Sequence, residues 1–379
     1  MKFSKLLPTL KPYVAGEQPK DRSYIKLNTN ENPYPPSPLV KKAIRDFDAD
    51  SLRLYPDPDA SELKAALAKK HGVSSGNIFV GNGSDEVLGF CFPAFFDRRD
   101  CRSADGADGQ SASDGERRLA AVADKTPPIL FPDVTYSFYP VYANMYEIPY
   151  ERVPLRDDYT VDIGGYSGRP RQGVIIANPN APTGIALEIA RIEELIAANS
   201  DALVLIDEAY ADFWGYSAVP LVAKYQNLLV VRTFSKSYSL AGIRCGYAVG
   251  QKPLIAALET VKNSFNSYTL DAVTQKAALA ACADGEYYDM INERVVNVRD
   301  ALSLELRQNG FTVLKSDANF IFVKKDGFSG LELFSALRDK GVLVRHFAGE
   351  RTGDFIRVTV GTSADCRVFA DEIIGLTKK

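Results

Sequence analysis

The segment TFSKSYSLAGIRCGY, Thr233–Tyr247, places a lysine among small hydroxyls directly after the apolar run LLVVR. Lys236 is flanked by Ser235 and Ser237, and Arg244 follows eight positions later. A lysine amine is a useful nucleophile only when its pKa is depressed or when it is already held as a Schiff base. Hydroxyls and a guanidinium are suited to binding a phosphate. Taken alone, the segment also fits an ordinary surface loop.

A carboxylate ends the apolar run of ALVLIDEAY, at Asp207. The carboxyl edge of an open α/β sheet is where such folds bind their ligands. A carboxylate at that edge can act in catalysis, cap a helix or bind magnesium. This segment alone favours none of the three.

A third motif, GNGSDE at Gly81–Glu86, lies between an expected strand and an expected helix. Glycines followed by Ser84 and Asp85 at a helix N-terminus leave backbone N–H groups free to bind a phosphate. The chain has neither a GxGxxG nor a GxxxxGK[ST] pattern here, which argues against dinucleotide and P-loop sites.

Short apolar runs that alternate with helical patterns must position these motifs. We expect strands at Ile78–Val80, Ile129–Phe131, Val174–Ala177, Ala202–Ile206, Leu228–Val231 and Gly246–Val249. Helices are expected at Ser84–Phe96, Tyr136–Tyr146 and Leu187–Asn199. Continuous apolar runs of this kind predict an α/β fold with a mostly parallel central sheet covered by helices on both faces.

The pattern changes near Leu270, where long helical stretches lead into short strands and a closing helix. The expected elements are helices at Asp271–Ala283 and Glu286–Asn309 and strands at Phe320–Val323, Val342–Arg345 and Phe355–Val360. We therefore predict a large domain over residues 36–265 and a smaller α+β domain over residues 266–379. Residues 1–35 are predicted to pack on the small domain and on a dimer partner.

Composition excludes several classes of function. With a formal net charge of −3, the chain is not expected to bind nucleic acid. Its apolar runs are far shorter than a membrane span, and its start lacks the apolar core of a signal peptide. Two histidines and five cysteines without CxxC spacing give no expectation of a metal site. Reduced thiols in a cytoplasmic protein are the simplest interpretation.

The segment 98–125, RRDCRSADGADGQSASDGERRLAAVADK, has almost no large apolar residue. This composition is typical of a solvated surface loop, and we expect it to be mobile.

In this order along the chain, the motifs resemble those of the fold-type I aminotransferases that use pyridoxal phosphate. The resemblance covers almost the whole chain apart from segment 98–125. It implies that Lys236 forms the Schiff base with the cofactor and that Asp207 pairs with the pyridine nitrogen. It also implies contacts to the ring from Tyr210 and Tyr136. The implied ligands of the cofactor phosphate are Ser84, Asp85, Ser235 and Arg244.

One position departs from that family. NPNAPTG, Asn178–Gly184, resembles the family motif NPNNPTG, in which the asparagine before Pro-Thr-Gly bonds the ring hydroxyl. That position is Ala181 here. Either Asn180 binds the cofactor instead, or Tyr210 acts without help.

The N-terminal run YIKLNTNENPYPPSP, with LKPY and LYPDP, is similar to the histidinol-phosphate aminotransferases. This resemblance implies a homodimer in which Tyr55 reaches the cofactor phosphate of the neighbouring subunit. It further implies that two substrates, histidinol phosphate and 2-oxoglutarate, exchange an amino group in histidine biosynthesis. The implied substrate-binding residues are Tyr13, Asn30, Arg345 and Arg357.

Three alternatives share most of these motifs. An aromatic-amino-acid aminotransferase would use the same chemistry on another substrate. A lyase of the threonine-phosphate decarboxylase type would keep the cofactor site and break a different bond. A regulatory protein that binds pyridoxal phosphate without turnover is disfavoured by the presence of Lys236, Asp207 and Arg357 and by the lack of a DNA-binding module.

Overall fold

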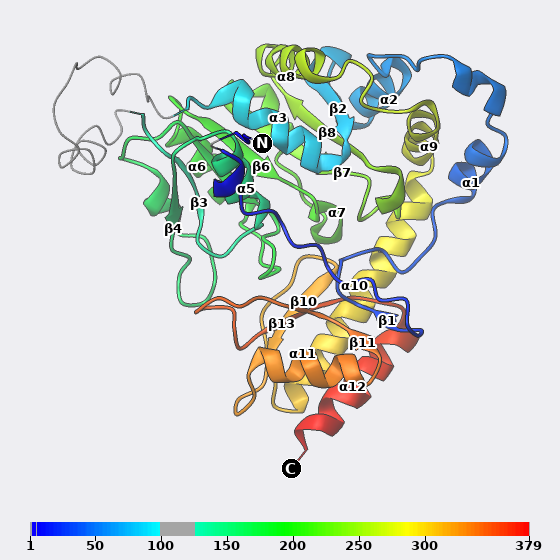
Figure 1. Cartoon of the computed structure of the whole chain (residues 1–379), viewed down its shortest axis with the longest axis vertical. Helices are drawn as coiled ribbons and strands as arrows, with labels where there is room; N and C mark the ends of the chain where they lie inside the picture. Colours follow the sequence, from blue (N-terminus) through cyan, green and yellow to red (C-terminus); the bar gives the residue numbers. More distant parts are fainter. Residues whose placement is uncertain (1, 5, 99–125, 379) are drawn as a thin grey trace.

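A central seven-stranded sheet dominates the computed structural model, which describes residues 2–4, 6–98 and 126–378 (Figure 1). Its strand order is β2-β8-β7-β6-β5-β3-β4. The strands are β2 (Ile78–Asn82), β3 (Ile129–Pro132), β4 (Tyr150–Val153), β5 (Gly173–Ala177), β6 (Leu203–Asp207), β7 (Leu228–Thr233) and β8 (Cys245–Gly250). All neighbouring pairs are parallel except those of β8, which is antiparallel to both β2 and β7. The predicted mostly parallel sheet is confirmed.

The antiparallel direction of β8 follows from the short connection before it. Only Phe234–Arg244, with one 3-10 turn at Ala241–Ile243, separates it from β7. A parallel crossover needs a dozen or more residues, usually with a helix. Consequently the start of β8 lies at the same edge of the sheet as the end of β7, and Arg244 is returned to the neighbourhood of Lys236.

Helices cover both faces of this sheet. Side chains of α2 (Ser61–His71), α6 (Ile189–Ala197) and α9 (Ala272–Cys282) pack with one set of strand residues, and those of α3 (Gly83–Phe95), α5 (Phe138–Met145) and α8 (Lys252–Phe265) with the other. The two sets alternate along a strand: Val174 and Ile176 face one cluster, and Ile175 faces the other. This alternation is expected of strands that are buried on both sides.

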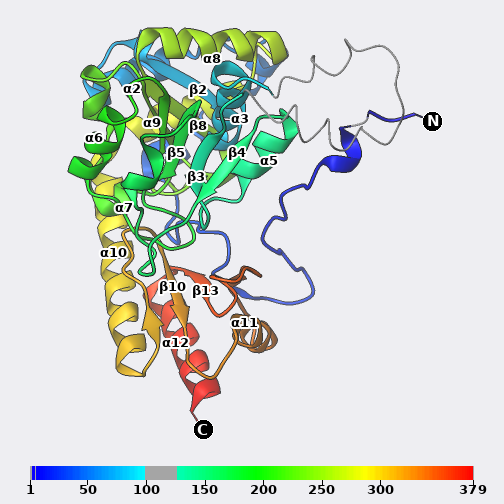
Figure 2. The ribbon, with the colours of Figure 1, turned by 90° about the vertical axis from the view of Figure 1, so that its left-hand side faces the viewer.

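A smaller unit lies below the sheet in Figures 1 and 2. Its four-stranded sheet has the order β12-β13-β10-β9, formed by β9 (Thr312–Val313), β10 (Phe320–Lys324), β12 (Arg345–His346) and β13 (Ile356–Thr359). The helices around it are α10 (Gly285–Gln308), α11 (Gly330–Asp339) and α12 (Ser363–Thr377). Near the N-terminus, β1 (Ile25–Lys26) pairs in parallel with β11 (Val342–Leu343) of this unit.

The long helix α10 joins the two units (Figure 2). Its first turns, with Tyr288 and Ile291, belong to the core of the large unit, whereas Val295 and Leu302 belong to that of the small one. Helix α9 packs against α1 (Pro38–Arg45) and α2 and shares the large core. The packing partner of α10 therefore changes from the large unit to the small unit partway along the helix. This change lies later in the sequence than residue 266, where the domain boundary was predicted. The division into two domains stays a prediction.

Several elements were not predicted, and residues 99–125 of the expected surface loop lie outside the described residues. These elements are α1, α2, β4, α8 and α11. No helix among the described residues is long and apolar enough to cross a membrane.

His71 gives a testable dependence of stability on pH. Burial, followed by the charges of Arg232 and Lys70, lowers the pKa of this imidazole from 6.5 to about 3, and its Nε2 lies 2.9 Å from the Tyr247 hydroxyl. Below pH 6.5 the unfolded chain takes up a proton that the folded protein excludes, so stability is lost as the pH falls from 6.5 toward 3. At pH 5 the loss from this residue should be about 1–2 kcal/mol.

The measurement is urea unfolding at pH 7.5 and pH 5 for the wild type and for His71→Gln, which cannot titrate. The free energy of unfolding should fall less between the two pH values in the variant. An equal fall in both proteins would mean that His71 is protonated in the folded state.

Candidate active site

A cavity of about 300 Å³ opens at the carboxyl edge of the central sheet, a size at the lower end for small-molecule sites. The strand ends bring their polar residues to it because parallel strands end on a common edge. Asp207 ends β6, Lys236 follows β7, Ser84 and Asp85 begin α3, and Arg244 precedes β8. Three motifs that are far apart in the sequence thus line one cavity.

Lys236 is the basic centre of this cavity. Its Nζ donates a hydrogen bond to the Thr29 carbonyl at 3.1 Å and lies 5.9 Å from the centroid of the Tyr210 ring. Burial and then the neighbouring Arg357 charge lower the pKa of this amine from 10.5 to about 8. An amine with this pKa is partly neutral near physiological pH, which makes it nucleophilic and able to take up and release a proton.

Asp207 is buried, with 5% of its surface exposed. Its Oδ2 accepts a hydrogen bond of 2.9 Å from the Tyr139 hydroxyl, and its Oδ1 accepts one of 3.3 Å from the Ala209 N–H. Burial raises the pKa of this carboxyl from 3.8 to about 6, although the Tyr139 bond acts in the opposite direction. Burial destabilises the ionised form of this carboxylate, and a cation bound beside it would stabilise that form.

One end of the cavity is built for an anion. The first turn of α3 presents Ser84 and Asp85, and the Arg244 guanidinium lies 3.0 Å from Asp85 Oδ2 and 3.5 Å from Ser235 Oγ. Arg244 has a φ of 54°, in the left-handed region that only special local requirements impose on a side chain of this size.

Glycine is needed where these elements meet. A Cβ at Gly246 would lie 2.3 Å from the Ser84 nitrogen, and one at Gly83 would lie 2.6 Å from an Arg244 nitrogen. The absence of a side chain lets β8 approach the start of α3, so that helix N–H groups and a guanidinium converge.

A residue of the N-terminal segment, Asn30, fixes the orientation of Tyr210. Its hydroxyl accepts a hydrogen bond of 2.9 Å from Asn30 Nδ2, and its ring packs edge-on against Phe320. Asn30 is fixed in turn, since its N–H donates to Thr359 Oγ1 at 2.9 Å and its carbonyl accepts from Asn319 at 3.0 Å. Buried contacts from three parts of the chain thus hold one phenol in the cavity wall.

Two arginines of the small unit line the other side. Arg357 donates to the Asn28 carbonyl at 3.2 Å, while its buried Nε has no hydrogen-bond partner among the described residues. Arg345 donates to the carbonyls of Val14 at 2.7 Å and Ala15 at 3.2 Å. Tyr13 also lines the cavity, and its ring stacks on Phe138.

The structure brings together most of the site residues predicted from the sequence. Those that line the cavity are Tyr13, Asn30, Ser84, Asp85, Tyr136, Asp207, Tyr210, Ser235, Lys236, Arg244, Arg345 and Arg357. Two do not. Tyr55, which was predicted to reach the site of the neighbouring subunit, is 81% exposed and stacks on Tyr268.

Asn180 lies outside the cavity lining. Its amide donates to the Val134 carbonyl at 2.9 Å and to Thr183 Oγ1 at 3.0 Å, and its oxygen accepts from Thr135 at 2.8 Å. These bonds hold the loop together and leave the side chain outside the cavity lining. Ala181 lines the cavity, whereas Asn180 does not. A cofactor contact from Asn180, or from Tyr210 without it, stays a prediction.

Sequence reasoning also missed residues that shape the site. Tyr139 lies three positions after Tyr136, a spacing that, within the expected helix Tyr136–Tyr146, could have identified it as a second inward phenol. In the structure Tyr136 precedes α5, which begins at Phe138. Thr29 and Glu31 line the cavity beside Lys236, but short polar residues in an irregular segment give no periodic signal.

The donor set fits pyridoxal phosphate. A buried carboxylate, a lysine of depressed pKa and an anion site at a helix N-terminus match a pyridine nitrogen, an aldehyde and a phosphate. The orphaned Nε of Arg357 leaves a charged donor for a further anionic group. No cluster of His, Cys, Asp and Glu side chains suited to a metal ion occurs in the described part of the chain.

Comparisons with known proteins agree with this geometry. The model of the family "Aminotransferase class I and II" matches residues 22–101 and 110–373. The chain is 49% identical to a histidinol-phosphate aminotransferase of Bradyrhizobium diazoefficiens, over 96% of each chain. It is 45% identical to one of Brachyspira hyodysenteriae, also over 96% of each. A crystal structure of histidinol-phosphate aminotransferase from Sinorhizobium meliloti in complex with pyridoxal-5'-phosphate superposes with a TM-score of 0.81 and 25% identity, over 100% of this chain and 98% of that one.

Asp207→Asn should change activity and stability in opposite directions. Between pH 3.8 and about 6 the folded state binds a proton that the unfolded chain releases, so the ionised carboxylate destabilises the apoprotein above pH 6. The amide removes that charge while keeping an acceptor for Tyr139. Unfolding of the apoproteins at pH 8 should show the variant more stable by about 1–3 kcal/mol, with turnover reduced at least tenfold. Lower stability of the variant together with normal turnover would contradict the assignment.

The depressed pKa of Lys236 predicts how the apoprotein captures pyridoxal phosphate. Only the neutral form of the Lys236 amine would react with the aldehyde of the cofactor, with release of water. The capture rate, followed by absorbance, should therefore rise with pH and level off above about 8 rather than above 10.5. In Arg357→Gln the midpoint should move to higher pH, because one of the charges that lower the lysine pKa is gone. A midpoint unchanged by this substitution would exclude Arg357 as a cause.

Proposed function

The chain belongs to the class I and II aminotransferases, and from this premise we propose that it is a histidinol-phosphate aminotransferase. It uses pyridoxal phosphate to transfer the amino group of L-histidinol phosphate to 2-oxoglutarate. The products are imidazole acetol phosphate and L-glutamate, and the reaction is a step of L-histidine biosynthesis.

This proposal rests on a cavity that contains two separate groups of residues suited to binding anions. Arg244 and the start of α3 bind one anion at the sheet edge, whereas Arg345 and Arg357 come from the small unit. The first suits the phosphate of the cofactor. The second suits the phosphate of one substrate and the carboxylates of the other, because a planar guanidinium can bind either group through two N–H donors.

The cofactor and three residues of the cavity have separate roles in the reaction. Bound pyridoxal phosphate supplies an aldehyde that accepts the amino group and a ring that withdraws electrons from the substrate carbon. Asp207 holds a proton on the ring nitrogen, since a buried carboxylate stabilises a buried cation. Tyr210, fixed by Asn30, donates its hydroxyl proton toward the ring oxygen. Lys236 moves a proton at the substrate carbon through its Nζ.

Relative kcat/KM tests the substrate. With 2-oxoglutarate as acceptor, kcat/KM should be at least about a hundredfold higher for L-histidinol phosphate than for phenylalanine or O-phosphothreonine, because those donors leave part of the site unmatched. A preference for phenylalanine would make the protein an aromatic aminotransferase. Release of carbon dioxide from O-phosphothreonine without amino transfer would make it a decarboxylase.

Arg357→Gln serves as the companion variant in this assay. It should raise KM for 2-oxoglutarate about tenfold or more, because a charged hydrogen bond to a carboxylate is lost.

We also propose that the enzyme is a homodimer in which Tyr55 completes the site of the other subunit. Tyr55 and the neighbouring Leu52 and Leu54 are exposed, as are Phe265 and Tyr268. Tyr55 and Tyr268 stack at 4.5 Å, which gives this surface an aromatic centre. Exposed apolar side chains grouped in this way favour an interface between protein chains.

Subunit mixing tests this arrangement. Tyr55→Ala and Lys236→Ala, mixed at limiting cofactor, should form a heterodimer with one intact site, so activity should exceed that of the Tyr55→Ala parent. The tyrosine contributes one hydrogen bond to a charged group, worth about tenfold in cofactor affinity. The control pairs Lys236→Ala with the double variant Tyr55→Ala/Arg357→Ala, which leaves no intact site. No gain after exchange, verified by a tag, would place Tyr55 outside the neighbouring site.

A cytoplasmic location is part of the same proposal. Cys91, Cys245 and Cys366 are buried as free thiols, and Cys282 is half-buried. Free buried thiols suit a reducing compartment. Fractionation of cells that produce the protein would test it, and recovery with the membranes or outside the cell would contradict it.

A further inference from the structure

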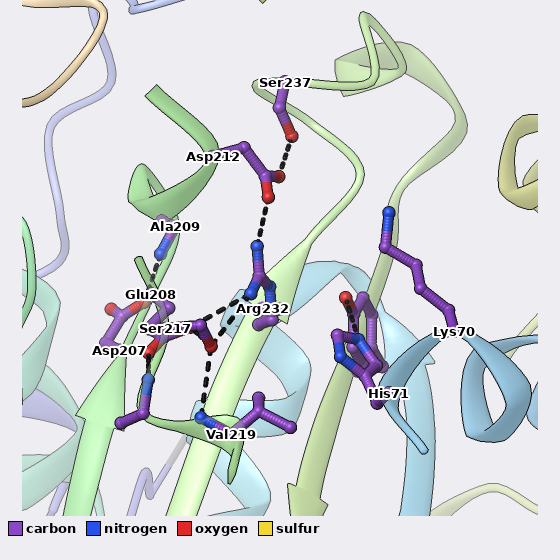
Figure 3. Close-up of polar contacts among 12 residues, drawn as sticks. Lys70, His71, Asp207, Glu208, Ala209, Asp212, Ser217, Val219, Arg232 and Ser237 are labelled. Carbon is purple, nitrogen blue, oxygen red and sulfur yellow. Dashed lines mark hydrogen bonds and ion pairs between the residues drawn. The ribbon is translucent and has the colours of Figure 1, made fainter. Parts of the chain in front are cut away.

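A second group of charged and polar side chains lies outside the cavity lining (Figure 3). It consists of Glu208, Asp212, Ser217, Arg232 and Ser237. Arg232 is at its centre, on β7, with a side chain that is 6% exposed. None of these residues touches the space in which the cofactor and substrate bind, so the chemistry described above does not account for them.

The contacts form a continuous chain from one loop to the other. Arg232 Nη1 donates to Glu208 Oε2 at 3.1 Å, and its Nη2 donates to Asp212 Oδ1. The other oxygen of Asp212 accepts a hydrogen bond from the Ser237 hydroxyl. At the far end Glu208 accepts from the Ser217 hydroxyl at 2.6 Å and from the Ala218 N–H at 2.5 Å.

Glu208 and Arg232 are buried, and Asp212 is half-buried. Burying charges is costly unless each is paired and hydrogen-bonded, and such groups are weak contributors to stability. Here every charge has its partner. Burial acts against ionisation of Asp212, but the Arg232 charge keeps the pKa of this carboxyl below its usual value. Two carboxylates thus face one guanidinium, and the neighbouring His71 is neutral because burial lowers the pKa of its imidazole. Burial raises the pKa of the Glu208 carboxyl, although the Arg232 charge acts in the opposite direction, so Asp212 is the more firmly ionised of the two carboxylates.

Residues of the network are close neighbours in the sequence of residues that line the cavity. Glu208 follows Asp207, Asp212 stands two positions after Tyr210, and Ser237 follows Lys236. The Ser237–Asp212 bond therefore joins the lysine loop to the helix α7 (Ala211–Trp214), which begins directly after Tyr210. Figure 3 shows Asp212 between the Arg232 guanidinium and the Ser237 hydroxyl.

We propose that Asp212 and Ser237, held by Arg232, are positioning residues that set Lys236 relative to Asp207 and Tyr210. A lysine whose loop is pinned in this way presents its amine to the aldehyde carbon of a cofactor whose ring is fixed by the other segment. Correct placement of two reacting groups is worth orders of magnitude in rate and equilibrium. The proposal rests on the cofactor chemistry proposed above, but not on the identity of the substrate.

The test compares two cofactor forms in Ser237→Ala and in a matched control, Ser217→Ala. Both substitutions remove one hydroxyl that donates to a carboxylate of the same network, but only Ser237 lies beside the lysine. Pyridoxal phosphate bonds covalently to Lys236, whereas pyridoxamine phosphate carries an amine in place of the aldehyde and binds without that bond. Equilibrium dialysis gives the dissociation constant of each, and melting temperatures record the loss of stability.

In Ser237→Ala the affinity for pyridoxal phosphate should fall about tenfold while that for pyridoxamine phosphate stays within about twofold. Ser217→Ala should lower the melting temperature without changing the ratio of the two constants. Ser237→Thr, which keeps the hydroxyl, should restore the ratio even if its methyl group lowers the melting temperature.

Equal ratios in Ser237→Ala, Ser217→Ala and the wild type would overturn the positioning role and leave the network a purely structural one. A wild type that binds both forms equally would instead contradict the covalent role of Lys236, so the two failures are distinguishable.

Discussion

Parallel strands end on one edge of a sheet, and this constraint determines where the chemistry of the protein can be. The ends of β2, β6 and β7 meet there, so that Ser84, Asp207 and Lys236 become neighbours although they are far apart in the sequence. The single antiparallel strand, β8, strengthens the effect because the chain re-enters the sheet at the same edge with Arg244 at its start.

Burial at that edge has opposite effects on the two groups that matter most. It makes the Lys236 amine easier to deprotonate, and it makes the Asp207 carboxyl harder to ionise. Each shift destabilises the charged form in the free protein, and a bound pyridine ring with an aldehyde can relieve both. The cavity thus lowers the stability of the free protein at the two residues that the cofactor needs. The Arg232 network is the contrasting case, because its guanidinium pairs with two carboxylates and lies outside the cavity.

Much of this could be predicted from the sequence, because buried strands and glycine turns leave local signals. The strands from β2 to β8 that carry the site were expected close to their observed positions, except for the edge strand β4, whose Glu151 and Arg152 are exposed and interrupt the apolar pattern. The direction of β8 depends on the length of a connection, which an apolar run does not encode. Asn180 was assigned from its place in a motif, but its hydrogen bonds to Val134 and Thr135 depend on a loop distant in the sequence. Tyr139 and Arg232 were missed because their importance lies in their partners.

The central claim is that one lysine of the cavity, Lys236, holds pyridoxal phosphate. Reduction of the holoenzyme with borohydride, followed by proteolysis and mass spectrometry, tests it most directly. The account predicts a pyridoxyl group on the peptide that contains Lys236, and none on that peptide when the substrate amine is present in excess before reduction. A pyridoxyl group on any other lysine, with Lys236 unmodified, would contradict it.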